Sequence, residues 1–326
     1  MGGTQARLVP TMVTPPAGGG FAPAYEKDPP KRFAFVIPGD EEMFLGGGAL
    51  NGAVGTLLQK EAKQPLAFNM KDGEIQKVKD HDGKMVPDFD KKSCPYSEMH
   101  HKVFQAAKDQ LNTPIFLGIN EIPAKMKSVV LSCTGVASDP GGYPFCAAFV
   151  STFNRAYRPY SPNNVGVVYA VGPLGRNNKA EGEGPVDPER EKHVFKDPKV
   201  FLQKIYDTGR NIMEAVEAHN GESHDDDKIE LLRVPIVAGG TFINPAVQPV
   251  QVAHALLWGL ASADKGKVAV ELMPGGAMEE ARKRYTNETG PDNTTDPLLK
   301  EIKTASPGFC LFGLLPSFAS CIGKRG

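Results

Sequence analysis

The positions of the hydrophobic residues divide the chain into alternating strand-like and helix-like segments. Phe33–Ile37 is a continuous apolar run bounded by charged and turn-forming residues, which predicts a strand buried on both faces. A glycine cluster follows, and then Leu50, Val54 and Leu58 recur at helical spacing up to about Ala62. The first unit is therefore a strand, a glycine loop and a helix.

The same alternation returns in the second half of the chain. Apolar runs predict strands at 165–171, 231–237 and 268–272, and helical periodicity marks 200–219, a segment opened by Pro249, and 277–285. The region between the halves is less regular, with a helix at 99–111, a strand at 128–132 and an apolar run at 145–153 that fits either a helix or a buried strand. Near the N-terminus, Ala6–Val9 fits a short edge strand.

Strands that alternate with helices predict an α/β domain, here a three-layer α/β/α arrangement around a mostly parallel mixed sheet. We expect residues 1–30 to be a flexible Pro/Gly-rich arm and residues 31–285 to be the domain, with a long insertion around 66–165. Residues 286–326 carry no clear element and are expected to form a C-terminal strap or tail.

Composition narrows the function classes. The 326 residues carry a formal net charge of -1, so no global basic field points to nucleic acid, and we do not expect it as a partner. The five cysteines are scattered without metal-ligand spacing, which favours reduced thiols in a cytoplasmic or nuclear protein and no metal site. No apolar segment reaches the roughly 18 residues of a membrane span, so no membrane partner is expected.

Two glycine-rich loops carry the candidate chemistry. Gly46–Gly48 and Ala238–Gly240 each lie between a predicted strand and a predicted helix. Such a loop lets the backbone approach an anion closely, while the N–H groups and the dipole of the helix attract it. Two loops at one edge of a sheet favour a ligand with two phosphates. Neither loop has the lysine of a Walker A motif, and there is no GxGxxG fingerprint.

Three segments around these loops resemble the macrodomain family in order. Residues 36–54 (VIPGDEEMFLGGGALNGAV) resemble the family's "VNAAN…LxGGGGVDGAI", residues 168–173 (VYAVGP) resemble "VIHTVGP", and residues 234–245 (VPIVAGGTFINP) resemble "FPAISTGIYGYP". The family binds ADP-ribose, free or attached to proteins, and some members hydrolyse the attachment. The resemblance covers roughly residues 31–285.

The resemblance implies a ligand site at the two loops, and several positions depart from the family. The family's conserved asparagines fall on Ile37 and Asp40, and the aspartate that some hydrolytic members need falls on Asn51, which cannot act as a general base. Phe242 keeps the aromatic position beside the distal ribose. The implied ligand-binding residues are Asp40, Gly46, Gly47, Gly48, Asn51, Ala238, Gly239, Gly240, Thr241, Phe242, Ile243 and Asn244.

The leading hypothesis is that the protein binds ADP-ribose, a related nucleotide or an ADP-ribosylated protein between the two loops. One alternative is a hydrolase that removes ADP-ribose from proteins or cleaves a related ester. Its catalytic residues are unassigned, and replacing Asn51 with aspartate is expected to create or raise that activity. The other alternative is a non-catalytic scaffold with a decayed cleft. No cofactor is expected.

Overall fold

The computed structural model describes residues 8–13, 31–46, 49–79, 83–89, 94–138, 142–177, 188–288 and 290–304. Eight strands form one sheet in the order β1-β12-β11-β2-β10-β9-β8-β7. The strands of this sheet are β1 (Thr11–Met12), β2 (Phe33–Gly39), β7 (Ile115–Leu117), β8 (Val130–Val136), β9 (Ala148–Phe153), β10 (Asn164–Val171), β11 (Leu231–Val234) and β12 (Ala269–Leu272).

The sheet is mixed. From β1 to β10 along this order each strand runs parallel to its neighbour, whereas β9, β8 and β7 continue the sheet antiparallel. The carboxyl ends of β10, β2, β11 and β12 therefore meet at one edge of the sheet. This edge is where ligands bind in open α/β sheets.

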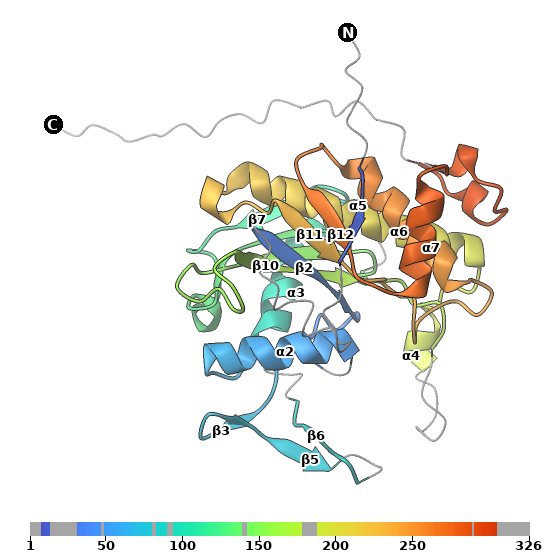
Figure 1. Ribbon diagram of the computed structural model, residues 1–326. Helices are drawn as coiled ribbons and strands as arrows, with labels where there is room; N and C mark the ends of the chain where they lie inside the picture. The colour runs from blue at the N-terminus through green and yellow to red at the C-terminus, as the bar shows by residue number, and fades with distance from the viewer. Residues whose placement is uncertain are drawn as a thin grey trace.

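Helices cover both faces of the sheet (Figure 1). α2 and α3 lie on one face, and α5, α6 and α7 lie on the other, which confirms the predicted three-layer α/β/α class. None of the described helices is long and apolar enough to cross a membrane. The helices are α2 (Ala49–Ala62), α3 (Pro95–Ala107), the short α4 (Pro188–Glu191), α5 (Pro198–Glu222), α6 (Pro249–Ala263) and α7 (Gly276–Tyr285).

Strand β2 shows why the sheet is buried on both faces. Ala34 and Val36 belong to the hydrophobic cluster under α5 and α6, whereas Phe33, Phe35 and Ile37 belong to the cluster under α2 and α3. Successive side chains of a strand point to opposite faces, so a continuous apolar run supplies both cores. The strand predicted from this run is confirmed.

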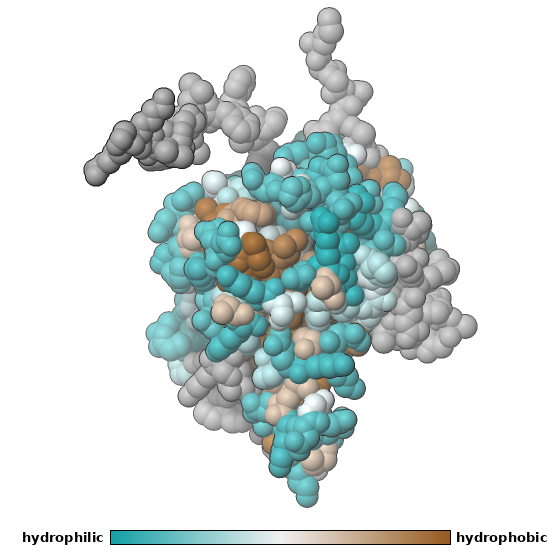
Figure 2. Space-filling view, turned by 90° about the vertical axis from the view of Figure 1, so that its left-hand side faces the viewer, coloured by the Kyte–Doolittle hydropathy of each residue, from teal (hydrophilic) through white to brown (hydrophobic). Residues whose placement is uncertain are grey.

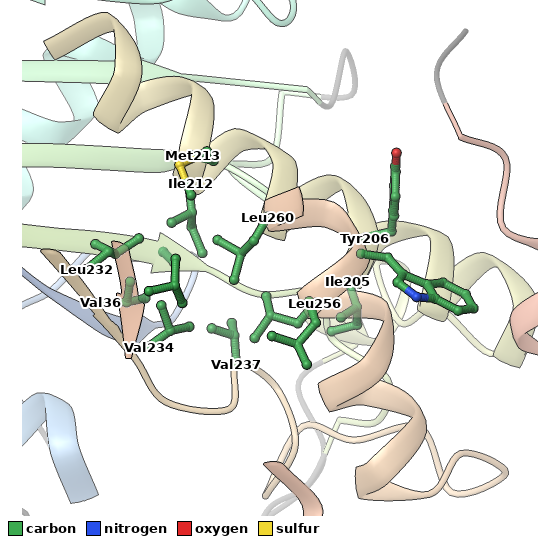
Figure 3. Close-up of a cluster of buried hydrophobic side chains, with 14 of the residues drawn as sticks. Val36, Ile205, Tyr206, Ile212, Met213, Leu232, Val234, Val237, Leu256 and Leu260 are labelled. Carbon is green, nitrogen blue, oxygen red and sulfur yellow. The ribbon is translucent and has the colours of Figure 1, made fainter. Parts of the chain in front are cut away.

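The α5–α6 pair forms the tightest helix contact of the domain. A Cβ atom added at Gly259 would lie 2.1 Å from the Tyr206 carbonyl oxygen, and one added at Gly209 would lie 2.4 Å from the Leu256 carbonyl oxygen. Figure 3 shows Tyr206 and Leu256 on the two helices, with Val36 of the sheet in the same cluster. The two glycines therefore let the helix backbones touch, which fixes α6 and the loop before it against the sheet.

Much of the stretch 66–165, expected to be an insertion, belongs to the core of the domain. It contributes α3 and the antiparallel strands β7, β8 and β9. The ambiguous run 145–153 forms β9, since its residues pair with β8 on one side and β10 on the other. The strand predicted at 128–132 overlaps β8, whereas the run 145–153 fits either element, because a single apolar run does not distinguish a buried strand from a helix.

Two small hairpins lie outside the main sheet. β3 (Met70–Lys71) pairs with β4 (Glu74–Ile75), and β5 (Lys77–Lys79) pairs with β6 (Met85–Pro87). They project below α2 in Figure 1 and form the narrow lower end of the molecule in Figure 2, where apolar side chains stand among hydrophilic ones. We call these residues, 69–89, the hairpin arm.

At the N-terminus the structure differs from the expected flexible arm. The edge strand is Thr11–Met12, paired in parallel with β12, rather than Ala6–Val9. Leu8 and Val13 are buried. Residues 1–7 and 14–30 lie outside the described part of the chain, so the arm stays a prediction there.

The difference in burial between Leu8 and Val9 allows a matched test of whether this segment docks on the sheet. Leu8 is 5% exposed and Val9 is 77% exposed. Leu8→Ala is expected to lower the free energy of unfolding by about 2 kcal/mol or more, because it empties space in the core, whereas Val9→Ala should change it by less than about 0.5 kcal/mol. Urea unfolding of the two variants measures the difference. Equal, small effects would mean that residues 8–13 do not dock on the sheet.

The described part of the C-terminal segment packs on the domain. Residues 286–304 contain the 3-10 turns η3 (Pro291–Asn293) and η4 (Leu299–Glu301), and the side chain of Leu299 is buried in the core under α5. The Trp258 Nε1 of α6 donates to the Glu288 carbonyl at 2.8 Å. This part forms a strap over α5 and α6, and residues 305–326 lie outside the described ranges.

Candidate ligand-binding site

A cavity of about 970 Å³ opens at the carboxyl edge of the sheet. Its walls come from the segments that follow β2, β10, β11 and β12, from the first turns of three helices, and from the hairpin arm. The lining residues are Pro38, Gly39, Asp40, Phe44, Gly46, Leu50, Asn51, Phe89, Gly172, Pro235, Ile236, Ala238, Gly239, Gly240, Thr241, Phe242, Pro249, Met273, Pro274, Gly275, Gly276, Ala277 and Met278.

Three helices begin at this cavity. Residues in the first turns of α2, α6 and α7 line it, including Asn51, Pro249 and Gly276. The first N–H groups of a helix have no partner within the helix, and the dipole makes that end positive. Among the described lining residues there is no lysine or arginine, and Asp40 is the charged side chain. The positive potential of the cavity therefore comes from the backbone.

Hydrogen bonds from neighbouring side chains hold the segment between β2 and the first loop. After β2 the chain turns at Met43, which has a positive φ of 54°, and the Phe44 carbonyl accepts two hydrogen bonds of 2.9 Å, from the Tyr169 hydroxyl and from Asn51 Nδ2. Gly39 is required here because a Cβ atom would lie 2.0 Å from the Tyr169 ring. These contacts fix the described segment that follows β2 against β10 and the first turn of α2.

The second loop is tied to the segment after β10. The Phe242 carbonyl accepts from the Gly175 amide at 2.8 Å, and the Thr241 carbonyl accepts from Arg176 Nε at 2.9 Å. Ala238 has a positive φ of 54°, a conformation that is strained for a residue with a Cβ atom. The loop is therefore held in one shape by its neighbours.

The glycines of the two loops have different roles. A Cβ atom on Gly46 would lie 2.4 Å from the Phe44 ring, and one on Gly239 would lie 2.3 Å from the Ile236 side chain, so a larger residue at either position would have to displace a neighbouring side chain. Gly240 lines the cavity, and a Cβ atom on it would meet nothing within 4 Å. Gly47 and Gly48, also implied as ligand contacts, lie outside the described residues.

The structure brings most of the implied site residues together. Asp40, Gly46, Asn51 and the run Ala238–Phe242 all line the cavity. Phe242 is half-buried, and the Arg190 guanidinium lies 5.1 Å from the centre of its ring. The sequence motifs therefore mark one continuous site.

Ile243 and Asn244 differ from this expectation, because neither lines the cavity. Ile243 packs against the hydrophobic core. Asn244 is buried, its Nδ2 donates to the carbonyls of Phe195 and Lys196 at 2.8 and 3.1 Å, and its Oδ1 accepts from the Ala246 amide at 2.9 Å. This amide secures the end of the loop and has no free donor for a ligand.

Asn51 lines the cavity but also supports the loop. Its Nδ2 donates to the Phe44 carbonyl, while its Oδ1 is buried without a hydrogen-bond partner in the described part of the chain. An aspartate at this position would lose the donor and place a carboxylate oxygen against the Phe44 carbonyl. The Asn51 side chain therefore has a structural role, because it supports the segment before α2.

This geometry reverses the expectation for Asn51→Asp. The variant should unfold about 1–2 kcal/mol more easily, because the Phe44 carbonyl loses one of its two donors and faces a carboxylate oxygen. This cost exceeds the roughly 0.3–1 kcal/mol that a carboxylate gains at a helix N-terminus. We expect no release of ADP-ribose from a modified protein. Urea unfolding beside Asn51→Ala, which removes the donor without adding charge, measures the effect. Full stability together with hydrolysis would contradict this role.

Sequence reasoning missed part of the site. Gly275-Gly276, between β12 and α7, has the same strand–glycine–helix design as the other loops and was a detectable signal. No feature of the sequence indicated Phe89, because it belongs to the hairpin arm and reaches the cavity only in the folded chain. There its ring meets the Phe44 ring edge-on, with 5.6 Å between the ring centres. It is 38% exposed.

The buried titratable groups beneath the site are held neutral. Burial first, and a hydrogen bond to Ser151 in the opposite sense, set the pKa of the Cys133 thiol at about 12, and burial likewise raises that of Cys146 to about 12. Burial lowers the pKa of His100 to about 3. None of the three described cysteines, Cys94, Cys133 and Cys146, lines the cavity, so the described part of the chain offers no cysteine nucleophile there.

Comparison with known proteins gives two distant similarities. No protein-family model matches the chain. The DNA/RNA-binding protein ALBA4 of Plasmodium falciparum is 23% identical over 245 residues, which cover 74% of this chain and 56% of that protein. The ALBA4 of Plasmodium yoelii yoelii gives the same identity and coverage. The chain thus spans about half the length of the curated relatives it matches.

Among solved structures, a mutant macrodomain of Oceanobacillus iheyensis has a TM-score of 0.36 and 13% identity, covering 80% of this chain and 88% of that one. A TM-score this low does not establish a shared fold. The α/β/α class therefore rests on the sheet and helix layers described above.

Proposed function

We propose that the cavity binds ADP-ribose, or an ADP-ribosyl group on a partner, with its diphosphate between the two glycine loops. The observation that carries the proposal is the meeting of α2, α6 and α7 N-termini with the two loops in one cavity. Backbone N–H groups and helix dipoles at such a point favour an anion. The identity of the nucleotide, ADP-ribose, is inferred from the sequence resemblance to macrodomains.

The size and shape of the cavity fit an extended ligand. It crosses the ends of β12, β11 and β2, and neighbouring strands lie about 4.8 Å apart, so it can hold groups on both sides of a diphosphate. Pro235, Ile236 and the segment Met273–Met278 give one end apolar walls, which suits a base. Phe242 and Asn51 lie at the other side of the loops.

Binding is favoured over the two alternatives. A hydrolase needs a general base within reach of the bond it breaks, and Asn51 cannot serve. A decayed scaffold needs no open cavity, yet the described residues line a cavity of about 970 Å³. Hydrolysis stays an alternative for experiment.

A second candidate is nucleic-acid binding, because the ALBA4 relatives are DNA/RNA-binding proteins. The expectation that nucleic acid is not a partner stays untested. The cavity itself favours a small ligand, because its described walls carry no lysine or arginine, the side chains that neutralise a phosphate backbone. Any such binding would use another surface.

Isothermal titration with ADP-ribose tests the proposal, with AMP as the comparison ligand. ADP-ribose should bind more tightly than AMP, because it spans both loops. Labelled single- and double-stranded oligonucleotides of RNA and DNA, titrated in a gel-shift assay over a range of salt, test the second candidate. No heat with millimolar ADP-ribose would contradict the first proposal, and salt-dependent oligonucleotide binding would support the second.

A further inference from the structure

Resting on the proposed function, we infer that the Asp40–Phe44–Phe89 end of the cavity receives a planar, positively charged group attached to the distal ribose. The charge of Asp40, the aromatic pair and the open space beside them carry this inference. A nicotinamide ring and the guanidinium of an ADP-ribosylated arginine both have this chemistry.

The first observation is the negative charge of Asp40 in a cavity whose other features favour an anion. Three helix N-termini and two glycine loops favour an anion, yet the charged side chain among the described lining residues is the carboxylate of Asp40. A carboxylate facing a diphosphate repels it. A ligand with a cation at this end would instead gain from it.

The second observation places the carboxylate beside the aromatic pair. The Met43 amide donates to the Asp40 carbonyl at 3.1 Å, which closes a turn between Asp40 and Phe44. Burial first, and the charge of Asp40 second, raise the pKa of Tyr169 beside this turn. The Tyr169 hydroxyl donates to the Phe44 carbonyl at 2.9 Å. Asp40 and Phe44 are therefore neighbours in the wall of the cavity.

The third observation is an exposed ring at the same end. Phe89 meets the Phe44 ring edge-on at 5.6 Å and the Phe68 ring at 5.5 Å, which holds it in place from two sides. It remains 38% exposed and lines the cavity. An exposed phenyl face attracts a planar cation through its quadrupole and its area.

A comparison of NAD⁺ with NADH tests the inference, since the two differ at the nicotinamide, which is charged and aromatic only in NAD⁺. Calorimetry should give about tenfold tighter binding for NAD⁺ than for NADH. A peptide carrying ADP-ribosyl-arginine, compared with one carrying ADP-ribosyl-serine, tests the guanidinium source. Whichever cationic ligand is preferred over its neutral counterpart identifies the source.

Two variants tie the preference to this end of the cavity. Asp40→Asn, which keeps the shape, should bring the affinity ratio of cationic to neutral ligand close to one and strengthen ADP-ribose. Phe89→Ala should weaken the cationic ligand severalfold more than ADP-ribose. Thermal melting of both variants checks that they fold.

The outcomes separate this inference from the proposed function. ADP-ribose binding without a preference for either cationic ligand would overturn the inference alone. An Asp40→Asn variant that loses ADP-ribose and NAD⁺ affinity equally would also overturn it, because the carboxylate would then be accepting a hydrogen bond from the ribose. Failure of wild-type protein to bind ADP-ribose would overturn both.

Discussion

Gly240→Val is expected to weaken ADP-ribose binding by at least about a hundredfold, which is about 2.8 kcal/mol. Gly240 lines the cavity, and a Cβ atom at this position meets no protein atom within 4 Å. The valine side chain would take the space of the diphosphate and block approach to the backbone N–H groups. Calorimetry with ADP-ribose measures the loss.

The control for this variant is Gly221→Val, near the end of α5. A Cβ atom there also meets nothing within 4 Å, and Gly221 does not line the cavity. Both variants should melt close to the wild-type temperature, but only Gly240→Val should lose the ligand. Wild-type affinity in Gly240→Val would show that the second loop does not hold the diphosphate.

Gly259→Val is expected to lower the free energy of unfolding by at least about 3 kcal/mol, at the upper end of the usual cost of overpacking. The added Cβ atom would lie 2.1 Å from the backbone carbonyl of Tyr206. A backbone atom cannot move aside as a side chain can, so α6 must shift away from α5.

A loss of this size is a large part of the roughly 5–15 kcal/mol that stabilises a typical domain, and urea unfolding measures it. Gly221→Val serves again as the control, because it makes the same substitution in a helix with open space around it. Equal stability of the two variants would mean that α5 and α6 do not cross at Gly209 and Gly259.

The buried parallel strands could be read from the sequence because each is a run of apolar residues that serves two cores. The run 33–37 and the helix at 49–62 were placed in this way. Among the antiparallel strands, β8 overlaps the strand predicted at 128–132, whereas the run that forms β9 fits either a strand or a helix and β7 was not predicted. Their order in the sheet could not be predicted, because their pairing depends on residues far apart in the chain. The same holds for the crossing at Gly259, which is set by a carbonyl of another helix.

In the site, the glycine loops can be recognised from the local sequence, whereas the contact partners of individual side chains cannot. The sequence located Gly46 and Ala238–Phe242 on one cavity, since glycine between a strand and a helix has few other uses. It could not show that Asn244 is taken up by the Phe195 and Lys196 carbonyls, nor that Phe89 reaches the cavity. These contacts exist only once the chain is folded.

The most direct measurement of the central claim is a crystal structure of the full chain with ADP-ribose. We expect the diphosphate to lie between the start of α2 and the loop Ala238–Gly240, within hydrogen-bonding distance of backbone N–H groups, with the adenine toward Met273–Met278. Density for the nucleotide on any other face, or a diphosphate held by lysine or arginine side chains away from these loops, would contradict the claim.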